Sequence, residues 1–306
     1  WIIIKEVLAP IAIGKEWTAP SEVSQLFKQI RGHQMARAAV ENSCWDMTAR
    51  VNNIALHKLL GGTQNYIPCG VSIGIQDTPE QLLEKIRIEV EAGYRRIKIK
   101  IKPGWDYDIL KLVRTTFPDI TLSVDANSAY TLADINLLKS LDEFNLLMIE
   151  QPLSHDDIVD HAHLQKQIAT DICLDEPITS LDKTRKAIEM KSGRIINLKL
   201  GRVGGFSEAI KIHNYCDEHN IPVWCGGMLE AGIGRSHNIA MSTLAGFSLP
   251  GDVSASKRYF REDIIEPPVT VSKDGFIKIT QVAGTGYEPK EEYIERITVR
   301  KEVFSA

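Results

Sequence analysis

Five charged residues recur along the chain at almost constant spacing. Lys100, Asp125, Glu150, Asp175 and Lys199 are separated by 25, 25, 25 and 24 residues. Each lies at or beside the carboxyl end of a short apolar run that is typical of a β-strand. In a barrel of parallel strands these ends meet at one face, where barrel enzymes carry their catalytic groups. The spacing therefore predicts a single site built from five consecutive strands.

The alternation of side chains indicates which way these groups point. In Arg96–Ile101 the isoleucines alternate with basic residues, and in Ile196–Leu200 the aliphatic side chains alternate with Asn197 and Lys199. Successive side chains of a strand face opposite sides. Because the aliphatic side is expected to meet surrounding helices, the charges are expected to point into the barrel. A buried charge without a partner is costly, so these residues must compensate one another or serve a function.

The same charges predict a metal ion and a reaction. With Ile67–Ile73 as the first strand, Lys100 and Lys199 end strands two and six, which lie opposite each other in an eight-stranded barrel. The carboxylates between them would repel one another without a cation, and their oxygen ligands favour Mg²⁺, with Mn²⁺ as an expected substitute. Such an ion acidifies the α-proton of a bound carboxylate by stabilising the enediolate, and it favours the neutral, basic form of a nearby lysine. The pattern therefore predicts proton abstraction next to a carboxylate. Buried ion pairs that only stabilise the barrel are the alternative.

The elements that must position these residues alternate between strands and helices. The predicted strands are Ile67–Ile73, Arg96–Ile101, Ile120–Asp125, Leu146–Glu150, Ile172–Asp175, Ile195–Leu200, Pro222–Gly226 and Phe247–Gly251. The predicted helices between them are Pro79–Ala92, Asp106–Thr116, Leu132–Leu141, Asp156–Ala169, Leu181–Lys191, Phe206–Glu218 and Ile233–Leu244. Eight such units in about 190 residues favour a closed α/β barrel of the (β/α)8 type over an open sheet. Residues 17–60 are predicted to be helical, and residues 264–299 to form short strands outside the barrel.

Composition excludes several classes of function. The 306 residues contain 36 Lys+Arg and 40 Asp+Glu, a net charge of −4, and 43% are hydrophobic. This is ordinary globular composition, without the basic surface of a nucleic-acid-binding protein or an apolar run of about 18 residues that could span a membrane. The five scattered cysteines contain no Cys-x-x-Cys pair, which predicts reduced thiols in the cytoplasm. The chain begins at Trp1 without a signal-peptide pattern, and its true start is expected to be missing.

Several stretches together identify the chain as similar to a known family. They are Arg96–Lys100 with Lys102–Asp106, Val124–Asn127, Ile149–Pro152, Cys173–Glu176, Asn197–Gly205, Trp224–Glu230 and Leu249–Asp252 with Ser254–Ser256. In combination they resemble the muconate-lactonising subgroup of the enolase superfamily. More closely, they resemble its branch of o-succinylbenzoate synthases and N-acylamino acid racemases. The similarity covers essentially the whole chain.

The resemblance implies a modified (β/α)7β barrel with an α+β capping domain. Residues 1–62 would be a partial cap, its helical part, with the N-terminal strands missing. Residues 63–255 would form the catalytic barrel, and residues 256–306 would return to the cap. In this family mobile loops of the cap close over the barrel mouth and select the substrate. Exposed apolar positions on the cap further predict a homo-oligomer.

The resemblance also implies roles for individual residues. Asp125, Glu150 and Asp175 match the Mg²⁺ ligands of the family, Lys100 matches the base, and Lys199 matches the lysine on the opposite face. The implied substrate contacts are Lys98, a supporting cation, together with Ser72, Gly227 and Met228. The groups implied to support the ligands are Asn127, Glu176 and Asn197.

The activity that this resemblance implies first is a Mg²⁺-dependent o-succinylbenzoate synthase, a lyase of menaquinone biosynthesis. In this reaction Lys100 would remove the α-proton of a cyclohexadiene carboxylate and return it to the departing hydroxyl, while Lys199 stabilises the enediolate. The alternative is racemisation of N-succinylamino acids by the same two lysines. A dipeptide epimerase or muconate cycloisomerase is disfavoured, because Gly251–Ser254 contains no Asp-x-Asp pair. A non-catalytic binding barrel would be expected to lack one of the five residues, and none is missing.

Overall fold

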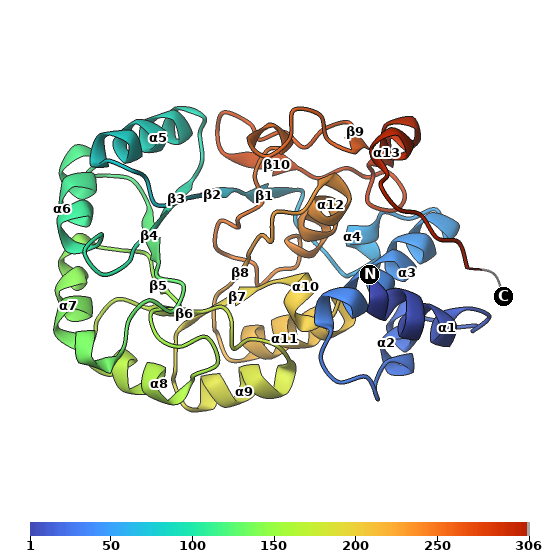
Figure 1. The fold of residues 1–306 in the computed structure, drawn as a ribbon, viewed down its shortest axis with the longest axis horizontal. Helices are drawn as coiled ribbons and strands as arrows, with labels where there is room; N and C mark the ends of the chain where they lie inside the picture. The colour runs from blue at the N-terminus through green and yellow to red at the C-terminus, as the bar shows by residue number, and fades with distance from the viewer. Residues whose placement is uncertain (305–306) are drawn as a thin grey trace.

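A curled parallel sheet forms the centre of the protein. The computed structural model describes residues 1–304. Its seven central strands follow one another in sequence order, each hydrogen-bonded to the next (Figure 1). They are β2 (Gly70–Ile73), β3 (Arg96–Lys100), β4 (Leu122–Asp125), β5 (Ile149–Glu150), β6 (Ile172–Leu174), β7 (Ile195–Leu198) and β8 (Val223–Cys225). This is the predicted α/β barrel architecture.

The eighth predicted strand, Phe247–Gly251, is not a regular strand. It makes one isolated parallel bridge to Val223 of β8 and another from Gly251 to Cys69, just before β2. The run therefore touches both edges of the curled sheet and joins them. Pro250 has no backbone N–H to donate, which explains why no continuous ladder forms there. The prediction of an eighth strand is wrong, whereas the barrel class is confirmed.

Helices cover the outside of the sheet, and the first five of them form an arc along the left and lower side of Figure 1. They are α5 (Pro79–Glu91), α6 (Tyr107–Thr116), α7 (Ile135–Ser140), α8 (Val159–Gln165) and α9 (Leu181–Glu189), followed by α11 (Phe206–Glu218) and α12 (Gly232–Met241). Shorter helical turns are η3 (Leu132–Asp134), η4 (Leu141–Phe144), α10 (Leu200–Val203) and η5 (Ser256–Arg258). The outward-facing Ile97 and Ile99 are buried in the same core as Ile86 of α5 and Leu110 of α6. No helix in residues 1–304 has the length and apolar composition needed to cross a bilayer.

The N-terminal part is helical, as predicted for residues 17–60. Its elements are η1 (Ile4–Leu8), α1 (Ala9–Ala12), η2 (Pro20–Glu22), α2 (Val23–Leu26), α3 (Gln34–Val51) and α4 (Leu56–Leu59). Helix α3 lies beside α10, the turn that follows Lys199 (Figure 1). The N-terminal helices therefore contact the barrel close to one of the predicted catalytic residues.

The C-terminal segment contains short strands, as predicted, and one helix that was not predicted. The strands are β9 (Ile265–Glu266), β10 (Phe276–Lys278) and β11 (Glu288–Pro289). Strand β10 pairs antiparallel with β1 (Tyr66–Pro68), and β11 pairs with β9. The unpredicted helix is α13 (Glu291–Ile297), which has no buried residue. Its seven residues contain three apolar or aromatic side chains, Tyr293, Ile294 and Ile297, which is too short a pattern to distinguish a helix from a strand.

The carboxylate of Glu41 fastens α3 to the barrel. It is buried and accepts hydrogen bonds from the backbone N–H groups of Phe206, at 2.7 Å, and Ser207, at 3.0 Å, as well as from the Ser207 hydroxyl. The indole N–H of Trp45 donates to the same group at 2.8 Å. These backbone donors lie in the first turn of α11, where the helix dipole favours a negative charge. Gly205 has a φ of 119°, and a Cβ there would clash with Glu41 Oε2, so the contact requires glycine.

Substitution of Glu41 by alanine is expected to lower the free energy of unfolding by about 3 kcal/mol, because it leaves several buried donors unpaired. Urea denaturation followed by circular dichroism measures this loss. Glu91→Ala, at the exposed end of α5, is the matched control and is expected to change stability by less than about 0.5 kcal/mol. A loss below about 1 kcal/mol for Glu41→Ala would contradict the tethering role.

Candidate active site

A cavity of about 380 Å³ lies at the carboxyl ends of the barrel strands. Its lining consists of Ser72, Lys98, Lys100, Asp125, Asn127, Asp175, Glu176, Lys199, Arg202, Gly227, Leu229, Glu230, Arg235, Asp252 and Tyr259. Three of the residues proposed from sequence are not part of this lining. Glu150 and Asn197 are completely buried, and Met228 lines a neighbouring cavity. All the other predicted site residues meet here.

Strand register explains why the charged side chains converge. Lys100 pairs with Asp125 across β3 and β4, and Asp125 pairs with Glu150 across β4 and β5. Glu150 pairs in turn with Cys173, which precedes Asp175 by two residues and therefore shares its face. The three carboxylates consequently lie on the inner face of three neighbouring strands. In the order of strands, β3 and β7 are the second and sixth, so Lys100 and Lys199 stand on opposite sides.

A basic side chain lies against each of the three carboxylates. The contacts are Lys100 Nζ to Asp125 Oδ2 at 2.6 Å, Lys98 Nζ to Glu150 Oε2 at 2.6 Å and Lys199 Nζ to Asp175 Oδ2 at 2.8 Å. Arg202 makes a further ion pair with Asp175. Within residues 1–304, no three His, Cys, Asp or Glu side chains are arranged to hold a metal ion as they stand. The carboxylates are instead compensated by ammonium and guanidinium groups.

The donor set nevertheless suits a hard divalent cation. All three side chains offer carboxylate oxygens, which Mg²⁺ prefers. Burial, with the charges of Asp125 and Asp175, raises the pKa of Glu150 above its usual range, although Lys98 opposes the shift. A cation beside the three groups would relieve that repulsion. In addition, the buried Oε2 of Glu176 has no hydrogen-bond partner among residues 1–304, so an acceptor beside the cavity is unsatisfied.

Known protein families match both parts of the chain. Residues 81–293 match the family described as enolase C-terminal domain-like, and residues 1–61 match the N-terminal domain of mandelate racemase and muconate lactonizing enzyme. The chain belongs to the enolase superfamily. Members of this superfamily typically depend on a divalent metal ion.

Similar proteins place the chain within one branch of the enolase superfamily. It is 52% identical over 304 residues to the o-succinylbenzoate synthase of Geobacillus kaustophilus, covering 99% of the chain and 81% of that protein. It is 45% identical to the N-succinylamino acid racemase of Thermus thermophilus, with 99% and 82% covered. A crystal structure of an enolase-superfamily member from Listeria innocua superposes with a TM-score of 0.93 at 46% identity, covering 96% of this chain and 79% of that one. The branch expected from the sequence motifs is confirmed.

Six of the lining residues were not predicted from the sequence, and two of them, Asp252 and Arg202, form ion pairs with predicted site residues. Asp252, directly after the irregular eighth run, lies 2.5 Å from Arg96 Nη2 and 2.7 Å from Lys98 Nζ. Although burial disfavours its charged form, Lys98 and Arg96 hold the pKa of Asp252 below its usual range. A count of the charges that point into the barrel could have predicted an acidic residue such as Asp252. Arg96 points inward together with the two lysines of β3, so the inward basic groups outnumber the three carboxylates. Arg202 gave no such signal, because it lies on the short helix α10.

The supporting residues hold the carboxylates through hydrogen bonds. The backbone N–H of Asn127 donates to Asp125 Oδ1 at 2.9 Å, and its side-chain amide donates to Glu176 Oε1 at 3.4 Å. The amide of Asn197 donates to Glu150 Oε1 at 2.7 Å. These contacts fix the orientation of two carboxylates inside the barrel.

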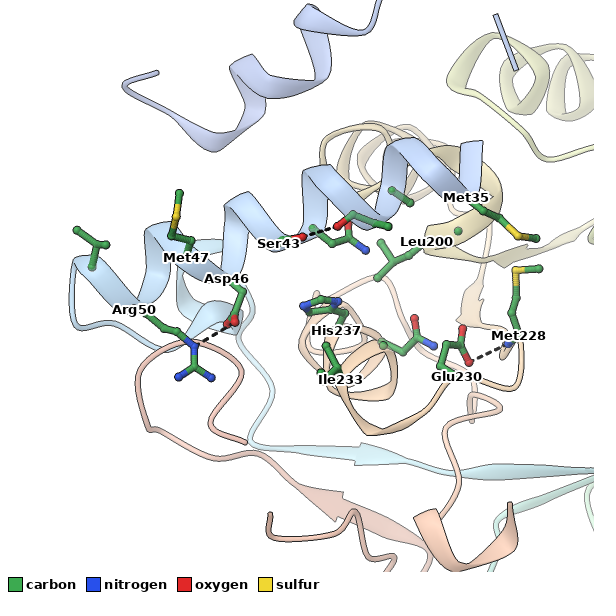
Figure 2. Close-up of a pocket in the computed structure, with 17 residues that line it drawn as sticks. Met35, Ser43, Asp46, Met47, Arg50, Leu200, Met228, Glu230, Ile233 and His237 are labelled. Atoms are coloured by element: carbon green, nitrogen blue, oxygen red, sulfur yellow. Dashed lines mark hydrogen bonds and ion pairs between the residues drawn. The ribbon is translucent and has the colours of Figure 1, made fainter. Parts of the chain in front are cut away.

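A second and more apolar cavity, of about 620 Å³, lies between α3 and α12 (Figure 2). Met35 of α3 and Ile233 and His237 of α12 line it, together with Met228. The backbone N–H of Met228 donates to Glu230 Oε2 at 2.9 Å, and Glu230 also lines the central cavity. The loop after β8 therefore separates the two cavities, with Gly227 on the central side.

The imidazole of His237 makes stability dependent on pH. It is buried edge-on against Phe206, with ring centroids 5.6 Å apart. Burial lowers the pKa of His237 to about 4. The folded chain therefore keeps this group neutral, while the unfolded chain binds a proton below about pH 6.5. The resulting contribution is fully present at neutral pH and is lost as the pH falls.

Between pH 7 and pH 5, His237 is expected to account for a loss of about 2 kcal/mol in the free energy of unfolding. Urea denaturation at both pH values, for the wild type and for His237→Gln, measures it. The variant is expected to lose correspondingly less stability over this interval. An identical loss in both proteins would contradict the assignment.

Proposed function

We propose that this protein is an o-succinylbenzoate synthase, a lyase that dehydrates 2-succinyl-6-hydroxy-2,4-cyclohexadiene-1-carboxylate with Mg²⁺ as cofactor and Mn²⁺ as a substitute. The observation that carries the proposal is the placement of Lys100 and Lys199 on opposite sides of a cavity that also holds carboxylates. Relatives named o-succinylbenzoate synthase, 45–52% identical over nearly the whole chain, support it. The small-molecule substrate is a carboxylate.

The three carboxylates Asp125, Glu150 and Asp175 would hold the cation. When bound, it supplies positive charge to the substrate carboxylate and so makes the α-proton more acidic. Lys100 and Lys199 now contact carboxylate oxygens that a cation needs. With a cation bound, these oxygens would be its ligands, and the ammonium groups of Lys100 and Lys199 would be free to face the substrate.

The two lysines then have different tasks. Lys100 takes the α-proton and passes it to the hydroxyl that departs from the same face, so one water leaves and a double bond forms. Lys199 stays charged on the other side and stabilises the negative charge that develops on the substrate. Asn127 and Asn197 keep their neighbouring carboxylates in place through the hydrogen bonds described above. Ser72 and Gly227 contact the substrate from the cavity wall.

Racemisation of N-succinylamino acids is the second candidate function. It is favoured by the 45% identical relative that carries this name and by the opposed positions of the lysines. One lysine would remove the α-proton and the other would deliver a proton to the opposite face. This isomerase activity uses the same residues.

The two activities are separated by measuring them side by side. Dehydration of the cyclohexadiene substrate is followed by ultraviolet absorbance with Mg²⁺ and then with EDTA, and α-proton exchange of N-succinylamino acids is followed in D₂O. Efficient Mg²⁺-dependent dehydration supports the synthase. Exchange without dehydration would favour the racemase instead. Absence of both would overturn both assignments and leave a binding barrel.

We also propose that the protein is a cytoplasmic homo-oligomer with no nucleic-acid or membrane partner. The five cysteines are free thiols, in keeping with a reducing compartment. Met47 and Val51 leave an apolar strip of α3 exposed, at 48% and 79%, which favours self-association. Light scattering coupled to gel filtration tests the oligomer.

A further inference from the structure

Two basic side chains of β3 lie against the Trp224 ring, and one of them, Lys98, also lines the active-site cavity. Arg96 is fully buried with its guanidinium carbon 4.7 Å from the centroid of the Trp224 ring, and the ammonium of Lys98 lies 4.7 Å from the same centroid. The Trp224 indole N–H donates to Cys173 Sγ at 3.2 Å, which fixes the ring. Two neighbouring cations in a buried site repel each other. They therefore need a shared anion.

Asp252 is that anion. One carboxylate oxygen contacts Arg96 at 2.5 Å and the other contacts Lys98 at 2.7 Å. Its backbone is held as well, since its N–H donates to the carbonyl of Cys225 at 2.8 Å. Arg96 is fixed from the other side, because its Nε donates to the carbonyl of Pro250 at 3.1 Å. The residue directly after the irregular eighth run thus places its carboxylate at a fixed position in the wall of the cavity.

Lys98 is shared among three carboxylates. Besides Asp252, its ammonium lies 2.6 Å from Glu150 Oε2 and 3.6 Å from Asp125 Oδ2. Its side chain is only 3% exposed, so water contributes little to its solvation. In such a site each carboxylate competes with the others for the same positive charge. Without the charge of Asp252, the ammonium group of Lys98 would pair only with Glu150 and Asp125, two of the proposed cation ligands.

We propose that Asp252 is a positioning residue that draws Lys98 partly away from Glu150 and Asp125 and so keeps these two carboxylates able to bind a divalent cation. The inference rests on the proposed cation site. Asp252 acts by attracting the ammonium group of Lys98. Arg96 weakens this attraction because it pairs with the other carboxylate oxygen of Asp252. Loss of the negative charge at Asp252 therefore weakens cation binding, whereas loss of the positive charge at Arg96 strengthens it.

The test is Mg²⁺ binding by isothermal titration calorimetry on EDTA-treated protein, without substrate. Asp252→Asn is expected to raise the Kd for Mg²⁺ about tenfold, while Asp252→Glu, which keeps the charge, stays close to the wild type. Arg96→Gln is expected to lower the Kd several-fold. Asp142→Asn is the matched control and should leave the Kd unchanged. Asp142 is half-buried and accepts the backbone N–H of Thr170 at 2.7 Å, at the amino end of β6 and away from the cavity.

The outcomes separate this role from a structural one. If Asp252→Asn lowers the midpoint of thermal unfolding but binds Mg²⁺ like the wild type, Asp252 is only a stabilising ion pair and the proposal is overturned. If that variant does not fold, a Kd for Arg96→Gln that equals or exceeds the wild-type value overturns it equally. A wild type that binds no Mg²⁺ would overturn both this inference and the proposed cofactor. A wild type that binds Mg²⁺ without dehydrating the substrate would overturn the proposed reaction alone.

Discussion

Replacement of Lys100 by alanine is expected to lower kcat for dehydration by at least about a thousandfold, because a positioned proton acceptor contributes about 10²–10⁴ to the rate. Lys100 is suited to this task because its side chain is 29% exposed at the cavity, whereas Lys98 on the same face is 3% exposed and surrounded by carboxylates. The loss is measured from ultraviolet progress curves at saturating Mg²⁺. Affinity for Mg²⁺ is not expected to fall, since the substitution removes the ammonium that now contacts Asp125.

The matched control is Lys102→Ala, since Lys102 is exposed two residues further along the chain. It is expected to retain nearly full activity. If Lys100→Ala kept more than a tenth of the wild-type kcat, another group would have to be the base.

Exchange of the α-proton in D₂O adds a second comparison. Lys100→Ala and Lys199→Ala should each retain α-proton exchange with only one enantiomer of an N-succinylamino acid, because the lysines face opposite sides.

Much of the barrel could be predicted because its strands and helices carry clear periodicity. In β3 the isoleucines meet the outer helices and the basic residues point inward, and a two-residue period determines both directions. The eighth run was mispredicted because its apolar residues resemble a strand, whereas Pro250 lacks a donor and the run makes only two isolated bridges to the sheet. Helix α13 was missed because its seven residues are too few to show a helical period.

The convergence of the charged residues could also be predicted, because parallel strands of similar length bring their carboxyl ends together. Asp252 and Arg202 could not be placed in the same way. Neither belongs to a strand, since Asp252 follows the irregular eighth run and Arg202 lies on the short helix α10. No strand period therefore determines the direction of either side chain. The same holds for Met228, whose loop turns it toward the second cavity while its neighbour Gly227 lines the central one. Contacts made by loops depend on packing between distant segments, which a single sequence does not display.

Removal of the divalent cation is expected to abolish turnover and yet leave the protein folded. Each carboxylate proposed to bind the cation already has a basic partner, so the metal-free barrel does not bury three uncompensated charges. In EDTA, dehydration should fall by at least about a thousandfold and recover on addition of Mg²⁺. The free energy of unfolding should fall only by the binding contribution, about 2.7 kcal/mol when Mg²⁺ stands at 100 times its Kd.

Circular dichroism melting curves with Mg²⁺ and with EDTA measure how much stability the protein loses when the cation is removed. A chain that unfolds at room temperature in EDTA would show that the lysines do not compensate the carboxylates.

Lys100 has two proposed roles, as the base and as the ion-pair partner of Asp125 in the metal-free protein, and thermal unfolding separates them. Since its ammonium is a partner of Asp125 only while the cation is away, Lys100→Ala should destabilise the metal-free protein more than the Mg²⁺-bound one. The difference between the two melting midpoints should therefore be larger in this variant than in the wild type, whereas Lys102→Ala should leave it unchanged.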